Sequence, residues 1–273
     1  MQQTYVHGYH TRESTRLQDQ AQTLEDLLHG DTVYPAGSAV LEAGCGVGAQ
    51  TITLARNNPL ARITSIDISA DSVGEARARV ESNGLDNVEV RQADLFDLPF
   101  APGRFDHVFL CFVLEHLPDP MAGLAALKAS LKPGGTITVI EGDHGSTYFH
   151  PDSDAARAAI ACQVALQRGS GGDALIGRRL YPLLAQAGFD AINVSPRMVY
   201  VDASRPHLVD GFTRKTFTAM IEGVREQAVG AGLSTPEAFD AGVRDLHRTT
   251  EADGVFCYTF FKALAVTPGP AER

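Results

Sequence analysis

The segment Leu41–Gln50, LEAGCGVGAQ, places an acid ahead of three glycines at alternating positions. Gly44, Gly46 and Ala49 satisfy the pattern G-x-G-x-x-G/A, which is typical of a loop that holds a dinucleotide pyrophosphate at a helix N-terminus. Glu42 favours the opposite interpretation, because a carboxylate at the end of a strand repels phosphate and attracts a cation. The residues around this segment must therefore decide between an anionic and a cationic ligand.

Short apolar runs alternate with amphipathic stretches on the C-terminal side of this segment. Strands are predicted at residues 39–43, 62–67, 88–92, 107–111 and 136–141, with helices beginning near Thr51, Ser69 and Pro120. This alternation indicates an α/β fold with a parallel sheet covered by helices on both faces. Two later strands, near 191–200 and 255–263, are expected to form a closing antiparallel pair. Asn83-Gly84 and Pro133-Gly134-Gly135 are predicted helix exits.

The flanking segments predict additional helices. Apolar residues spaced along residues 12–29 form one helical stripe that Gly30 ends. About fifty residues between the last two strands predict two helices, the second starting at Ser234 or Thr235. We expect three parts: an N-terminal lid segment (1–37), a core (38–200 and 251–267) and a helical substrate lid (201–250).

Composition excludes several classes of protein. The 273-residue chain has a net charge of −10 and no block of basic residues, so nucleic acid is not an expected partner. No apolar run reaches the roughly 18 residues that span a bilayer, and the first residues have no apolar leader segment, so we expect a cytoplasmic protein. The widely spaced cysteines are expected to be reduced and packed as small hydrophobic residues: Cys45, Cys111, Cys162 and Cys257.

Acidic residues follow the second and third predicted strands. Asp67 lies 19 residues after Gly48, which suits a carboxylate that accepts both hydroxyls of a ribose. Asp94 follows the third strand, where an acid can accept a hydrogen bond from an adenine amino group. Because the carboxyl ends of parallel strands form the binding edge of such a sheet, these acids fit the nucleoside of NAD and of S-adenosylmethionine equally well.

Six short segments occur in an order that is specific to one family of proteins. They are similar to the motif set of the class I S-adenosylmethionine-dependent methyltransferases: Glu42–Gly48, Asp67, Ala93-Asp94, Phe105-Asp106, Glu115–Leu117 and Leu131–Gly135. The resemblance covers roughly residues 38–142. It implies a Rossmann-like, mostly parallel seven-stranded sheet with an antiparallel last strand, an N-terminal helix and a helical lid inserted before the last strand.

The same resemblance implies which residues bind the cofactor. The glycine loop approaches the methionine portion, Asp67 takes the ribose, and Asp94 with Leu95 takes the adenine. Glu42 suits a cationic sulfonium and opposes a pyrophosphate. The full set expected from the resemblance is Glu42, Gly44, Gly46, Gly48, Gln50, Thr51, Asp67, Ile68, Asp94, Leu95, Cys111 and Phe112, with Tyr9 and Arg16 closing over the methionine end.

The fifth strand ends in an unusual polar string, EGDHGSTYFHP, at residues 141–151. Asp143 and His144 form a candidate catalytic pair in which the carboxylate orients the imidazole. Alternatively, His144 joins His150 and His247 around a divalent metal such as zinc, or His144 is only a hydrogen-bonded histidine. The sequence leaves these three alternatives open.

The acceptor is expected to be a small molecule. The strings HGYHTRESTRLQDQAQTL, GDHGSTYFHP and FCYTFFK are loosely similar to bacterial natural-product enzymes that C-methylate α-keto acids, which implies an enolate stabilised by a metal or a base. Arg178 and Arg197, together with Tyr148, are candidate substrate contacts, and Arg179 and Arg214 are further candidates for a substrate carboxylate.

Alternative functions remain open at this stage. One is O- or N-methylation of a small natural-product or cofactor precursor, and another is non-catalytic cofactor binding. A hypothesis from a different class, that the protein is an NAD(P)-dependent oxidoreductase, depends only on the G-x-G-x-x-A pattern of Gly44, Gly46 and Ala49. The final strand, FCYTFFKALAV, is a candidate edge for a homodimer.

Overall fold

The computed structural model describes residues 16, 19–21 and 23–269. The chain divides into two compact units. Unit 1 contains the described residues within 1–24, 142–175 and 197–260, and unit 2 contains those within 25–141, 176–196 and 261–273. One seven-stranded sheet has the order β3-β2-β1-β4-β5-β7-β6, and its β5-β7-β6 end is antiparallel. The seven strands and this antiparallel end confirm the predicted fold class.

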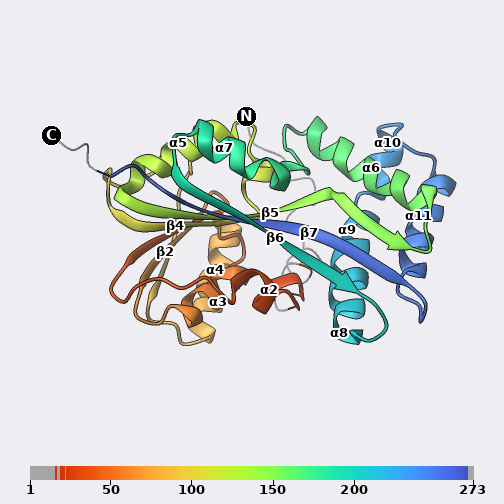
Figure 1. Ribbon diagram of the computed structural model, residues 1–273, viewed down its shortest axis with the longest axis horizontal. Helices are drawn as coiled ribbons and strands as arrows, with labels where there is room; N and C mark the ends of the chain where they lie inside the picture. Colours follow the sequence, from red (N-terminus) through yellow and green to blue (C-terminus); the bar gives the residue numbers. More distant parts are fainter. Residues whose placement is uncertain (1–15, 17–18, 22, 270–273) are drawn as a thin grey trace. The chain divides into compact units, whose positions relative to one another are not determined.

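Unit 2 contains the parallel part of the sheet. Its strands are β1 (Ala39–Ala43), β2 (Arg62–Asp67), β3 (Val88–Gln92), β4 (Phe105–Cys111) and the first part of β5 (Leu131–His150). Helices α2 (Glu25–His29), α3 (Ala49–Asn57) and α4 (Ala70–Ser82) lie on one face, and α5 (Pro120–Ser130) and α7 (Leu180–Gln186) lie on the other (Figure 1). Every strand pair from β3 to β5 is parallel, so the carboxyl ends meet at one edge.

Polar side chains start the helices that follow β2 and β4. The Ser69 hydroxyl accepts the Ser72 N–H at the start of α4. The Asp119 carboxylate accepts the Ala122 N–H at the start of α5, whose first residue is Pro120. Each cap satisfies an amide that the first helical turn leaves without an internal partner. These starts agree with those predicted from the sequence.

The core beneath α5 and α7 is strictly apolar. Leu41, Val108 and Ile137 from three adjacent strands pack there with Leu124 of α5 and Leu184 of α7. All five side chains have no exposed surface. Burial of this cluster holds the strands in register and so fixes where the loops after β1, β2 and β4 emerge.

Unit 1 is mainly helical. It contains the last part of β5, the last five residues of β6 (Asp190–Val201), from Arg197 onward, and the start of β7 (Val255–Val266), as far as Phe260. Its helical elements are α6 (Asp154–Gly169), α8 (Pro206–Leu208), η3 (Val209–Thr218), α9 (Ala219–Gly223), α10 (Arg225–Gly230) and α11 (Pro236–Arg248). Thr235 caps α11 through the Ala238 N–H, as predicted. Helices α6 and α11 pack together where Gly242 meets Ala155 and Ala159.

One prediction about local structure is wrong and another is incomplete. Residues 201–250 form five helical elements rather than two, because η3 is a ten-residue π-helix that the α-helical periodicity does not reveal. Pro133–Gly135 lie just after the end of α5 at Ser130, as predicted, but they also belong to the first part of β5. They coincide with a register shift between β4 and β5, where proline and glycine interrupt a regular ladder. The predicted domain boundaries stay a prediction.

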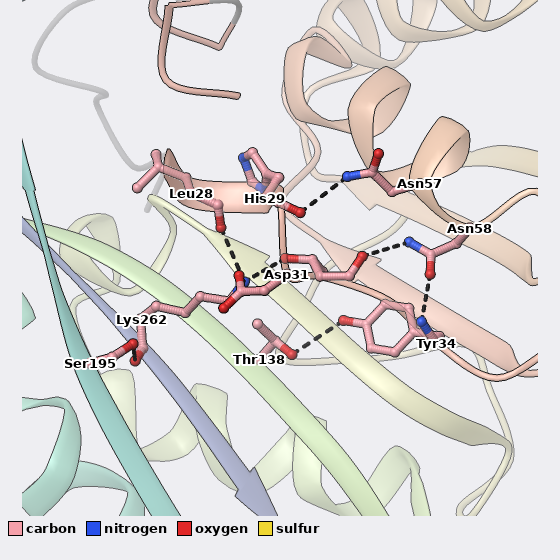
Figure 2. A network of polar contacts seen from close by, with 10 residues as sticks. Leu28, His29, Asp31, Tyr34, Asn57, Asn58, Thr138, Ser195 and Lys262 are labelled. Carbon is pink, nitrogen blue, oxygen red and sulfur yellow. Dashed lines mark hydrogen bonds and ion pairs between the residues drawn. The ribbon is translucent and has the colours of Figure 1, made fainter. Parts of the chain in front are cut away.

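A buried lysine ties the last strand to the beginning of unit 2 (Figure 2). Lys262 of β7 is 7% exposed, and its Nζ donates to the Leu28 carbonyl, the Thr32 hydroxyl and an Asp31 carboxylate oxygen, at 3.1, 2.6 and 2.5 Å. Nearby, Asn58 donates to the Thr32 carbonyl at 3.0 Å. Burial of an ammonium is costly unless every N–H is used, and here all three have acceptors. This network therefore fixes the α2–β1 connection.

Removing the buried ammonium should destabilise unit 2. We expect Lys262→Met to lower the free energy of unfolding by about 2 to 4 kcal/mol, because it leaves the Leu28 and Thr32 acceptors buried without a donor. Lys132→Met is the matched control, since Lys132 pairs with Asp106 at the surface. Its cost should stay under about 1 kcal/mol. Urea denaturation of both variants measures the difference, and equal losses would contradict the assignment.

Candidate active site

The glycine loop of unit 2 requires glycine for conformational reasons. Gly44, Gly46 and Gly48 have φ values of 74°, 52° and 78°, in the left-handed region that side chains disfavour. The amides of Gly44 and Cys45 both donate to the Ile66 carbonyl, at 2.8 and 2.9 Å. A Cβ at Gly46 would meet no atom within 4 Å, so the backbone there faces open space. The loop thus presents bare backbone at the edge where β1 and β2 end.

Glu42 lies below this loop and is 2% exposed. Its Oε2 accepts the hydroxyl protons of Thr51 and Ser65, at 2.7 and 2.6 Å. Burial raises the pKa of Glu42 from its ordinary value of 4.5 to about 7, although these two hydrogen bonds oppose the rise. The Glu42 carboxyl group is therefore enclosed and does not face the solvent. The Thr51 hydroxyl donates to Glu42 and so does not face the solvent either.

Asp67 joins the end of β2 to the glycine loop. Its Oδ2 accepts the Gly46 N–H at 2.8 Å and its Oδ1 accepts the Ser69 N–H at 2.9 Å. Burial raises the pKa of Asp67, and these backbone hydrogen bonds oppose the rise. The side chain of Ile68 is 59% exposed beside it. The carboxylate consequently sits next to an exposed apolar surface at the strand end.

The other predicted cofactor residues of unit 2 are distributed over the same edge. Asp94 is exposed and its Oδ1 accepts the Phe96 N–H at 2.8 Å, whereas Leu95 is buried in the core. Gln50 lies in the first turn of α3, next to the buried His29 ring, although no hydrogen bond of ordinary geometry joins the two. Cys111 is buried, and burial raises its pKa well above its ordinary value. All four cysteines are free and buried, as predicted.

The residues after β4 adopt an unusual backbone conformation. Phe112 has φ of 60°, a left-handed conformation that is rare for a bulky residue. Its N–H donates to the Ile140 carbonyl at 2.9 Å. Glu141, a neighbour that sequence reasoning did not assign a role, accepts the N–H groups of Val113 and Leu114 through Oε1. The only feature of the sequence that could have indicated this role of Glu141 is that an acid stands at the end of the predicted fifth strand.

In unit 1, His144 is 7% exposed and its Nδ1 lies 2.7 Å from the hydroxyl of Tyr258. Asp143 accepts the Gly145 N–H through Oδ1 at 3.0 Å. Tyr258 was missed from the sequence, because it lies 114 residues away within an aromatic strand that favoured a packing role. A Cβ at residue 142 would lie 2.3 Å from the Tyr258 hydroxyl, so Gly142 makes room for this ring.

Aromatic rings surround the imidazole of His144. Phe217 of η3 lies 6.0 Å from it, edge-on, and also contacts Phe256 and Tyr258. Phe212, five residues earlier, packs on the same strand. Since a π-helix repeats its hydrogen bonds at five residues, it places Phe212 and Phe217 on one face. The π-helix therefore assembles the aromatic surroundings of His144.

The predicted metal centre is wrong for the described residues. No group of three or more histidine, cysteine, aspartate or glutamate side chains among them is arranged to hold a metal ion. His144 pairs with Tyr258, His247 Nε2 lies 2.7 Å from a Glu222 carboxylate oxygen, and His150 is exposed. The three histidines predicted as ligands of a zinc ion do not converge.

The remaining predicted residues belong to different units. Tyr148 of unit 1 is 54% exposed and its hydroxyl lies 3.1 Å from the Met198 sulfur. Arg197 is also in unit 1, whereas Arg178 is an exposed residue of η2 (Ile176–Arg179) in unit 2. Arg16 donates to Gln20 at 3.0 Å, and Tyr9 lies outside the described residues.

The raised pKa of Glu42 predicts a pH dependence of stability. Because its pKa is near 7 in the folded protein and near 4.5 in the unfolded chain, the Glu42 contribution is complete below pH 4.5 and is lost as pH rises through 7. Relative to Glu42→Gln, the unfolding free energy should fall by on the order of 3 kcal/mol over this interval. Urea denaturation at pH 5 and 8 measures this, and parallel profiles for the two proteins would refute it.

Comparison with known proteins identifies the family. Residues 40–135 match the family model described as a methyltransferase domain. The 27-O-demethylrifamycin SV methyltransferase of Amycolatopsis mediterranei (strain S699) is 30% identical over 227 residues, which cover 82% of this chain and 76% of that protein. The solved structure of the [4+2]-cyclase SpnF has a TM-score of 0.58 and 21% identity, and covers 92% of this chain and 82% of that chain, so it shares the fold.

Other relatives match only a part of their own length. A 37.1 kDa protein in transposon TN4556 of Streptomyces fradiae is 35% identical over 72% of this chain, which spans 54% of that relative. The protein syc1184_c of a Synechococcus strain is 45% identical over 37% of this chain, which spans 24% of that relative. The long match to the rifamycin enzyme and the methyltransferase domain decide the assignment: the chain belongs to the class I S-adenosylmethionine-dependent methyltransferases.

Proposed function

We propose that this enzyme methylates an oxygen atom of a small, largely apolar metabolite, with His144 as the base. The observation that carries this proposal is the hydrogen bond between His144 and Tyr258 inside a cluster of aromatic rings. A hydroxyl acceptor must lose a proton as the methyl group arrives, and a histidine is the side chain best suited to take it near neutral pH.

The carboxyl edge of unit 2 fits S-adenosylmethionine. Open backbone at Gly46 suits a close approach of the ligand, and Asp67 and Asp94 suit the ribose hydroxyls and the adenine amino group. Ile68 and Phe96 are 59% and 41% exposed there, an apolar surface suited to a purine ring. When bound, S-adenosylmethionine supplies an activated methyl group. Gln50 and Phe112, with Tyr9 and Arg16, stay proposed contacts to the same ligand.

The protein's own contribution is alignment and proton removal. Holding acceptor and methyl donor in line accounts for most of the acceleration, on the order of 7 to 11 kcal/mol. When Nδ1 of His144 donates to the Tyr258 oxygen, Nε2 carries the lone pair that a base needs. Asp143 precedes this histidine and stays a proposed orienting residue.

The chemistry of the acceptor follows from its surroundings. Phe217, Phe256 and Tyr258 are each at most 2% exposed and make the surroundings of His144 apolar, which favours an acceptor with an apolar carbon skeleton. A relative that matches 82% of this chain is named 27-O-demethylrifamycin SV methyltransferase, which supports an oxygen acceptor.

C-methylation of an α-keto acid is the second candidate. It draws on Arg178 and Arg197 as partners for a carboxylate and on His144 as the base that forms the enolate. The metal-stabilised form of this reaction has no support among the described residues. No helix in the described part of the chain is long and apolar enough to cross a bilayer.

A labelled-cofactor screen tests the proposed acceptor. Purified protein is incubated with methyl-labelled S-adenosylmethionine and two matched metabolite pools, one of hydroxylated apolar compounds and one of α-keto acids. We expect label on an oxygen of a product from the first pool. Label on a carbon next to a keto group would instead establish the second candidate.

Removing the base should slow methyl transfer without weakening cofactor binding. We expect His144→Asn to lower kcat by about 10² to 10⁴, and Tyr258→Phe to lower it less, because the ring then loses its orienting partner. The dissociation constant of S-adenosylhomocysteine should not change in either variant. His150→Asn is the matched control, since His150 is exposed, and it should keep full activity. Wild-type turnover by His144→Asn would exclude the base role.

A further inference from the structure

Glu141 has hydrogen bonds that the proposed reaction does not use. It is fully buried, and its Oε1 accepts the Val113 N–H at 3.0 Å and the Leu114 N–H at 2.7 Å. These amides stand at the start of the short helix η1 (Leu114–His116), where a helix has no internal acceptors to offer them. A single carboxyl oxygen from β5 thus closes the beginning of η1.

This hydrogen-bonded turn holds a strained residue between two fixed points. Phe112 has φ of 60°, a left-handed backbone conformation that is strained for a residue other than glycine. The strand β5 grips the segment on both sides of this residue, through the Ile140 carbonyl to the Phe112 N–H and through Glu141 to Val113. Such a conformation persists only where the surroundings over-determine it.

The same segment supports the glycine loop. A Cβ placed on Gly44 would lie 2.6 Å from Cγ2 and 3.0 Å from Cγ1 of Val113, so the Val113 side chain rests directly against the Gly44 backbone. Any shift of Val113 would therefore remove this side-chain contact and leave Gly44 held only from β2, through the Ile66 carbonyl. Glu141, Val113 and Gly44 form a continuous line of contacts from β5 to the loop.

We propose that Glu141 is a positioning residue for cofactor binding: by bonding the Val113 and Leu114 amides it keeps Phe112 left-handed and Val113 pressed against Gly44. The proposal rests on the proposed function only in that the glycine loop holds S-adenosylmethionine. Glu141 does not contact the ligand. It acts indirectly, by holding Val113, which in turn packs against the glycine loop.

The carboxyl group acts in this role as a neutral acceptor. Burial, and secondarily the neighbouring Glu115, raise the pKa of Glu141 well above its ordinary range. Its Oε2 is buried and has no hydrogen-bond partner among the described residues, which also favours a protonated oxygen. The amide of glutamine offers the same acceptor oxygen without charge, whereas methionine has a similar length and offers none. This difference separates positioning from mere space filling.

Three variants and two readouts test the proposal. The first readout is hydrogen exchange of the Val113 and Leu114 amides, and the second is the dissociation constant of S-adenosylhomocysteine by calorimetry. We expect Glu141→Met to reduce the protection of both amides, and the affinity for S-adenosylhomocysteine, by about tenfold or more, because two buried donors lose their acceptor. Glu141→Gln should restore both to within about threefold. Ile137→Val, which trims another fully buried side chain of β5, controls for a general loss of stability and should change neither.

A further variant isolates the last contact and covers the case in which Glu141→Met does not fold. Val113→Ala removes the support of Gly44 but leaves both hydrogen bonds to Glu141. It should weaken S-adenosylhomocysteine binding several-fold while the Leu114 amide stays protected. Wild-type protection in Glu141→Met, equal damage in Glu141→Gln, or full affinity in Val113→Ala would overturn the proposal. If the wild-type protein bound no S-adenosylhomocysteine, the proposed function would fail, while the exchange data would still decide whether Glu141 holds the segment.

Discussion

The left-handed turn after β1 is the constraint on which the candidate cofactor site depends. Three glycines supply the positive φ values, but conformational freedom alone does not fix the loop. Asp67 fixes it by accepting the Gly46 amide, while the Ile66 carbonyl accepts two more amides. The loop is thus held from β2, and its outer backbone stays open. A carboxylate at the end of β2 consequently has a structural role before it meets any ligand.

Much of the parallel sheet could be predicted from the sequence, because its signals are local. Apolar runs mark β1 to β4, and Ser69 and Asp119 cap the helices that follow β2 and β4 in the expected places. Thr235 likewise caps α11 of unit 1 where expected. The π-helix η3 was not predicted, since a side-chain period that departs from the α-helical one weakens the pattern on which helix prediction relies. The full length of β5 was not predicted either, because its second part is polar and lacks the apolar run that marks a buried strand.

The candidate site was predicted less completely, and the reason is distance along the chain. Motif order located the glycine loop, Asp67 and Asp94. It gave no indication that Glu42 would be enclosed by Thr51 and Ser65, or that His144 would pair with Tyr258, because those contacts join residues up to 114 positions apart. The metal hypothesis failed on the same ground. Histidine count and spacing suggested ligands, but His247 has Glu222 as a partner.

The Lys262 network has a consequence for how the protein is made. Its three hydrogen bonds join residues 230 to 234 positions apart, so the segment around Leu28 and Thr32 gains these bonds only after Lys262 has been synthesised. Before that point the Leu28 carbonyl and the Thr32 hydroxyl have no ammonium donor, and water takes its place. Non-local closure of this kind slows folding and exposes apolar surface for longer. Ordering of the α2–β1 connection by this network therefore follows the synthesis of β7.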